Sequence, residues 1–97
     1  MIAEAIKNEI VGLGRKAHEL TEVAYREHAA LRDEPGWTEK QRILLADMAL
    51  HLLQTALTDG GLSPDELKRN LYAILTVSDQ LLPGYSLKAS ADQLLIK

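Results

Sequence analysis

The sequence predicts an all-α fold, a small bundle of three main helices followed by a short C-terminal helix. Apolar residues recur at steps of three and four, as on one face of a helix. Leu, Ala and Ile dominate the apolar residues, Phe is absent, and this composition favours helices. The alternation of apolar and polar residues that marks strands is missing. The 97 residues are the right length for a single domain, 1–97.

The first helical pattern runs from Ile2 to Leu31 with heptad-like spacing. The sequence RDEPGW at 32–37 should end it, since proline disfavours a helical residue before it and glycine permits a left-handed turn. Gly12 and Gly14 interrupt the pattern, and each glycine costs a helix about 1 kcal/mol relative to alanine. Either the helix breaks there, or another backbone crosses close by. We therefore divide the segment into an arm, 1–13, and a helix, 15–32.

The second helix is expected at 39–58, where apolar residues cover most of the circumference. A helix of this kind is usually buried on several sides, so it should be the central one. Thr38 and Gln41 have the spacing of a capping box, and Trp37 is placed to pack across the new helix start.

The sequence TDGGLSPDELKRNL at 58–71 resembles part of a calcium loop, yet with Glu66 at the twelfth loop position and Gly60 at the sixth, only Asp59 and Glu66 remain as carboxylate ligands. Calcium needs six to eight oxygens, so we interpret the segment as a turn and a cap. In this interpretation two glycines, Gly60 and Gly61, close the preceding helix. Ser63 caps the next, and Glu66 bonds back to the cap amide.

The third helix is expected at 64–82, with Pro64 in the first helical position. The sequence PGYS at 83–86 ends it. A short last helix is expected at 87–96, where Ser90 and Gln93 have the spacing of a second capping box.

The charges argue against general binding to phosphate backbones, because the net charge is −3 and the basic residues alternate with acids. Two basic pairs stand out, Arg15 with Lys16 and Lys68 with Arg69. If a dimer brought them onto one face, the protein would be a small transcriptional or nucleoid-associated regulator. We keep nucleic-acid binding as an alternative.

The sequence has few candidate catalytic residues, because it contains no cysteine and no recognisable catalytic triad. His18 and Glu22 have the i, i+4 spacing of a helical metal pair, and His51 lies near Asp47 on the polar stripe of the second helix. Two ligands make a weak site, because catalytic zinc takes three. We therefore predict no enzyme activity, cofactor or metal, with a metal protein or enzyme using His18, Glu22 and His51 as a further alternative.

The arm carries apolar side chains beyond the expected length of the other helices. The second and third helices should each be about 30 Å long, whereas 2–31 unbroken would be about 45 Å. The apolar side chains of the arm can be buried in three ways: against its own bundle, against the C-terminal helix, or against a second chain. Two-fold homodimers are the commonest oligomers, which favours the second chain. The predicted interface consists of Ile2, Ile6, Ile10, Leu13, Gly12 and Gly14.

The leading functional hypothesis is a small non-catalytic helical protein that acts through protein–protein contacts, as a regulator, adaptor or antagonist of a larger partner. The N-terminus lacks the uninterrupted apolar stretch of an export signal. No segment is apolar enough to span a bilayer. We expect a soluble, cytoplasmic protein without a membrane or small-molecule partner.

Overall fold

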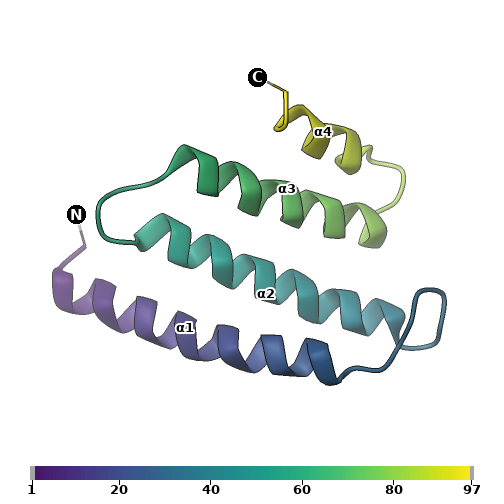
Figure 1. Cartoon of the computed structure of the whole chain (residues 1–97), viewed down its shortest axis with the longest axis horizontal. Coiled ribbons are helices and arrows are strands. Elements are labelled where there is room, and N and C mark those ends of the chain that lie inside the picture. Colours follow the sequence, from purple (N-terminus) through teal and green to yellow (C-terminus); the bar gives the residue numbers. More distant parts are fainter. Residues whose placement is uncertain (1, 97) are drawn as a thin grey trace.

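The computed structural model describes residues 2–96 and confirms the all-α prediction (Figure 1). Three long helices, α1 (Glu4–Glu27), α2 (Trp37–Leu57) and α3 (Pro64–Leu81), precede a short one, α4 (Leu87–Gln93). They lie side by side in chain order, and α2 is central, as predicted. Among these helices only sequence neighbours are in contact. The result is a layer one helix thick, with extents of 44 × 35 × 16 Å.

The first helix is continuous, so the helix break, one of the two alternatives for the glycines, is wrong. Residues of the arm form the first turns of α1 and run along the C-terminal end of α2. Gly14 is the point of close approach, since a Cβ there would lie 2.7 Å from Leu53 Cδ2. A leucine side chain, not another backbone, therefore occupies the space. Gly12 is different, because a Cβ there would meet nothing within 4 Å.

The start of α1 is tied to the α2–α3 turn by an ion pair. Lys7 Nζ donates a hydrogen bond to Asp59 Oδ1 at 2.6 Å. This hydrogen bond lowers the pKa of Asp59 below its ordinary 3.8, and the same contact raises the pKa of Lys7 above its ordinary 10.5. Asp59 is 83% exposed, so the pair is a surface contact and its effect on stability is small.

Replacing Asp59 by Asn is expected to lower stability at neutral pH and to have no effect in acid. A carboxylate whose pKa is depressed by folding stabilises the protein above its unfolded pKa, and this contribution is lost as the pH falls through the folded value. Urea titrations of wild type and Asp59→Asn, at pH 7 and well below pH 3.8, measure the difference. Asp33→Asn, in the turn after α1, is the control. A gap that persisted in acid would contradict the assignment.

The first helix ends at Glu27, five residues before the predicted end at 32. His28 is extended, and its Nδ1 accepts a hydrogen bond from the backbone N–H of Ala30 at 3.3 Å. Ala30 is buried, and both residues lie against Gly36. Burial of Ala30 against the turn thus replaces the last predicted helical turn, which leaves Leu31 exposed.

The second helix begins at Trp37, and the predicted capping box of Thr38 and Gln41 is wrong. Gly36 is the N-cap, in a left-handed conformation with φ of 91° and no side-chain cap. Its carbonyl already accepts from the backbone N–H of Lys40, so the helix has started before Thr38 could cap it. Gln41 is buried instead.

The α2–α3 turn has the predicted form. Gly60 and Gly61 have positive φ values of 91° and 95°, which favour glycine. Ser63 Oγ accepts from the backbone N–H of Glu66 at 3.3 Å, and proline follows at the first helical position. The carboxylate of Glu66 pairs with Arg69 Nη2 at 3.2 Å, where the prediction had it bonding back to the cap amide.

Removing the α3 cap should therefore destabilise the protein. We expect Ser63→Ala to lower the free energy of unfolding by about 1 kcal/mol, since it leaves a helix-terminal N–H without its acceptor. Ser90→Ala is the matched control, because the structure places Ser90 inside α4. Thermal or urea unfolding measures both changes. Equal losses from the two substitutions would show that the Ser63 hydroxyl is not the cap.

The last helix packs on α3, so the alternative in which it covers the arm is wrong. It ends at Gln93, earlier than predicted, and Ser86, with φ of 57°, is its N-cap in place of the predicted Ser90 box. Lys88 Nζ donates to Asp92 Oδ1 and to Tyr72 Oη on α3, at 2.7 and 2.6 Å. The hydrogen bond to the Asp92 carboxylate raises the pKa of Lys88 most, and the hydrogen bond to the Tyr72 hydroxyl raises it further.

No helix among the described residues is long and apolar enough to cross a membrane.

Candidate functional site

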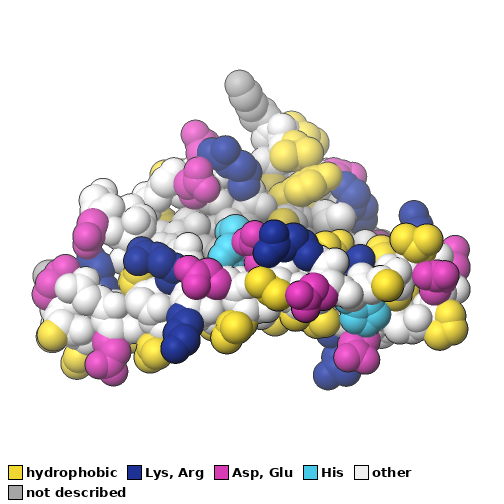
Figure 2. Space-filling view, turned by 60° about the horizontal axis from the view of Figure 1, so that its bottom comes forward, with side chains coloured by type: hydrophobic (Ala, Val, Ile, Leu, Met, Phe, Trp, Pro, Cys, Tyr) yellow, Lys and Arg dark blue, Asp and Glu magenta, His cyan; other side chains and the backbone are white. Residues whose placement is uncertain are grey.

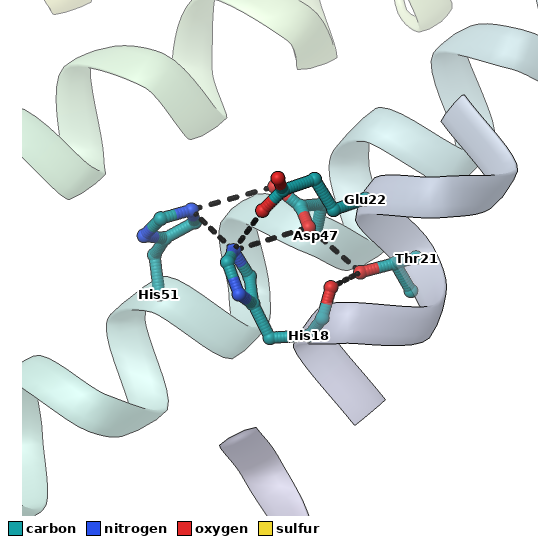
Figure 3. A network of polar contacts seen from close by, with 5 residues as sticks. All are labelled: His18, Thr21, Glu22, Asp47 and His51. Atoms are coloured by element: carbon teal, nitrogen blue, oxygen red, sulfur yellow. Dashed lines mark hydrogen bonds and ion pairs between the residues drawn. The ribbon is translucent and has the colours of Figure 1, made fainter. Parts of the chain in front are cut away.

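Two histidines and two carboxylates from α1 and α2 converge where these helices lie side by side (Figure 3). His18 Nε2 lies 2.8 Å from His51 Nε2, and the two imidazole rings meet edge to face. Asp47 approaches both rings, with Oδ1 3.3 Å from His18 Nε2 and Oδ2 3.4 Å from His51 Nε2. Glu22 Oε2 is 3.9 Å from His18 Nε2. We call these four residues the histidine cluster.

One side of the histidine cluster is buried and the other is exposed to solvent. Asp47 is buried, and Thr21 Oγ1 donates a hydrogen bond to its Oδ1 at 2.7 Å. Thr21 Oγ1 also lies 3.0 Å from the carbonyl oxygen of His18 on its own helix, so its hydrogen bond to Asp47 links α1 to α2. His51 and Glu22 keep 42% and 53% of their side-chain surface exposed. The carboxylate is therefore fixed, while solvent reaches the outer ligand atoms.

The structure brings together the three residues of the metal alternative, His18, Glu22 and His51, and places Asp47 beside them. Three of the four residues offer ligand atoms that all lie within 4.8 Å of one another: His18, Asp47 and His51. Each helix contributes an i, i+4 pair, and the two pairs face each other. Sequence reasoning found both pairs but not their meeting.

The opposite side of α1 is an uncovered apolar surface. Ile6, Leu13 and Leu20 are 58%, 63% and 65% exposed, and Ile2, just before the helix, is also exposed. We call these four residues the apolar face. Figure 2, in which the α1 side of the layer comes forward, shows apolar side chains spaced along its lower edge.

The predicted interface is therefore only partly exposed. Its large side chains Ile2, Ile6 and Leu13 belong to the apolar face. Ile10 is half-buried, and Gly14 is buried against α2. Gly12 is exposed on the outer side of α1. Within this chain, α1 thus contacts α2 through residues beside its apolar seam, such as Gly14 and Thr21, and the seam itself is only partly covered.

A groove between α1 and α2 adjoins the apolar face. Leu20 and Ala24 line it from α1, and Ile43 and Ala46 line it from α2. Glu39 and Arg42 stand at the α2 end. An apolar ridge and an apolar groove thus lie next to each other on one side of the layer.

The two basic pairs named by the sequence lie on helices that α2 separates. Arg15 and Lys16 are on α1, whereas Lys68 and Arg69 are on α3. Arg69 is paired with Glu66. A shared basic face would need a second copy of the chain, so nucleic-acid binding stays a prediction.

No protein-family profile matches this chain, and neither a curated protein nor a solved structure does.

Proposed function

We propose that the protein is a non-catalytic protein–protein interaction module that works as a homodimer through its apolar face. One observation carries this proposal: the folded chain exposes more surface, and is more extended, than a compact domain of its size. Its accessible surface is 6,934 Å², whereas a compact monomer of its mass exposes about 5,500 Å². The radius of gyration is 15.1 Å, against about 12.5 Å for a compact domain of this length.

The surplus of about 1,400 Å² is more than one partner contributes to a standard interface, about 800 Å². Among residues 2–96, no large side chain is completely buried, so a single layer does not enclose a core of its own. Stacking a second layer on the apolar face would supply one. Each large apolar side chain covered in this way contributes about 1.5–3 kcal/mol.

The same side of the layer has the features of a self-complementary surface. In a two-fold dimer the same patch serves both subunits, so a protrusion must fit a hollow on the identical surface. The ridge formed by Leu13 and Leu20 next to the α1–α2 groove meets this requirement. Helices that stack with ridges in grooves are the usual packing of α-helical layers.

Dimerisation in this way leaves the other edge of the layer available to a larger partner. Leu95 and Ile96, after α4, are 64% and 65% exposed. They border a groove that Tyr72 and Lys68 line from α3. A dimer would present this edge twice, which suits a regulator, adaptor or antagonist that binds another protein.

Sedimentation equilibrium over low micromolar to nanomolar concentrations tests the proposal. We expect a mass twice that of the 10.7 kDa chain, falling toward one chain on dilution. A protein that stayed monomeric at all concentrations, with the helical content of the described fold, would refute self-association.

A further inference from the structure

We propose that His18, Asp47 and His51 bind one divalent transition-metal ion of the Zn²⁺ class, with Glu22 as the fourth ligand. Two imidazoles and a carboxylate are a ligand set that such ions favour. The site bridges α1 and α2 within one chain. It does not depend on dimerisation, because Leu13 and Leu20 are turned by roughly 140° and 200° around α1 from His18.

The distances between the ligand atoms fit a tetrahedral ion. Zinc binds imidazole nitrogen and carboxylate oxygen at about 2.0–2.2 Å, so adjacent donors lie about 3.3–3.6 Å apart. The two histidine–aspartate distances, 3.3 and 3.4 Å, have this length, but each is measured to a different oxygen of Asp47, so the carboxylate would turn to bring one oxygen within reach of an ion held by both rings. The two Nε2 atoms, at 2.8 Å, would move apart by about half an ångström to match. Glu22 Oε2, 3.9 Å from His18 Nε2, lies on an exposed side chain that can rotate inward.

The charges of the cluster also favour a cation at its centre. A neutral imidazole carries one N–H, so when one Nε2 donates to the other, the acceptor directs its lone pair at the donor. Both nitrogens meanwhile face the oxygens of Asp47. The lone pair of the accepting nitrogen and the Asp47 carboxylate repel each other, and a positive charge between them, from a proton or a metal ion, removes this repulsion. A metal ion satisfies both nitrogens and the carboxylate at once.

The surroundings of Asp47 are those of a metal-binding carboxylate. Such ligands are oriented by hydrogen bonds from neighbouring groups, and loss of these groups typically weakens metal binding by 10–100-fold. Thr21 supplies that hydrogen bond here. The exposed sides of His51 and Glu22 give the ion a path from solvent.

Isothermal titration with ZnCl₂, on tag-free full-length protein stripped of metal by a chelator, tests the site. We expect one ion bound per chain and a higher melting temperature in Zn²⁺, because a ligand that binds only the folded state stabilises it. Co²⁺ should bind in the same place and give the intense visible absorption of a four-coordinate complex. Wild-type protein that took up neither ion would overturn the proposal.

Variants then assign the ligands. His18→Ala, His51→Ala and Asp47→Asn should abolish the Co²⁺ spectrum, whereas His28→Ala, a histidine outside the cluster, should leave it unchanged. Thr21→Val should weaken Zn²⁺ binding by about 10–100-fold. Circular dichroism checks that each variant folds. An equal loss of affinity in His28→Ala and His18→Ala, or an unchanged spectrum in folded His51→Ala, would show that the ion binds elsewhere.

Discussion

The double substitution Leu13→Glu with Leu20→Glu is expected to convert the dimer into a monomer. In a two-fold interface each substitution is present twice, so four leucine contacts are lost. At about 1.5 kcal/mol for each leucine, this raises the dissociation constant by on the order of 10⁴-fold. The introduced carboxylates add repulsion and a desolvation cost. Sedimentation equilibrium of the variant should give one chain at every micromolar concentration.

The fold of the monomer should survive this double substitution, because both side chains are exposed within one chain. Far-ultraviolet circular dichroism should show the same helical content. Leu62→Glu, in the α2–α3 turn, is the matched control, since Leu62 is 52% exposed but lies outside α1. Dissociation by the control, or a dimer that resists the double substitution, would place the contact elsewhere.

Introducing valine at Gly14 is expected to destabilise the α1–α2 pair. Even a Cβ at this position lies 2.7 Å from Leu53 Cδ2, so a branched side chain must displace the leucine. Overfilling a packed contact typically costs 1–3 kcal/mol, against a small gain in helix propensity over glycine. The net expectation is a loss of about 1–2 kcal/mol, measured by urea unfolding at fixed protein concentration.

Two further substitutions separate the effect of crowding at Gly14 from the effect of helix propensity. Gly12→Ala should raise stability by about 1 kcal/mol, because a Cβ there meets nothing and alanine favours the helix. Adding Leu53→Ala to Gly14→Val should recover part of the loss, although the same change alone destabilises the protein. If Gly14→Val were as stabilising as Gly12→Ala, the close contact with Leu53 would not matter for stability.

Helix positions could be predicted from the sequence where the local signals agree, as they do between α2 and α3. There two glycines, a capping serine and a proline each favour the same turn. They disagree between α1 and α2. Thr38 and Gln41 match a capping box, but burial of Ala30 against Gly36 decides where the chain turns. Local pattern cannot weigh a contact between segments whose arrangement is not yet known.

The histidine cluster was not predicted, because the sequence does not show how the first two helices face each other. His18 and His51 are equally far along the chain from the middle of the 32–37 turn, so in a helical hairpin they face each other. The turn in the structure is longer, residues 28–36, but this distance from the predicted turn was available from the sequence. What the sequence lacked was the rotation of each helix about its axis, which the contact between Gly14 and Leu53 fixes.

That rotation also explains the apolar face. The heptad-like seam of α1 predicts where its apolar side chains lie, and they do lie together. Within the chain, α1 meets α2 through Gly14, Thr21 and His18, which leaves Ile6, Leu13 and Leu20 of the seam exposed. Periodicity identifies an apolar surface but does not say which molecule covers it.

The chain-order arrangement of the layer has a consequence for how the protein folds. Because each helix touches only its neighbours along the sequence, all contacts between helices join adjacent elements, and proteins with such local topology fold fast. Stability then approaches a sum over neighbouring pairs, as in repeat proteins. Fraying would begin at α4 and α3, and the hairpin of α1 and α2, which carries both the histidine cluster and the apolar face, would be the last part to come apart.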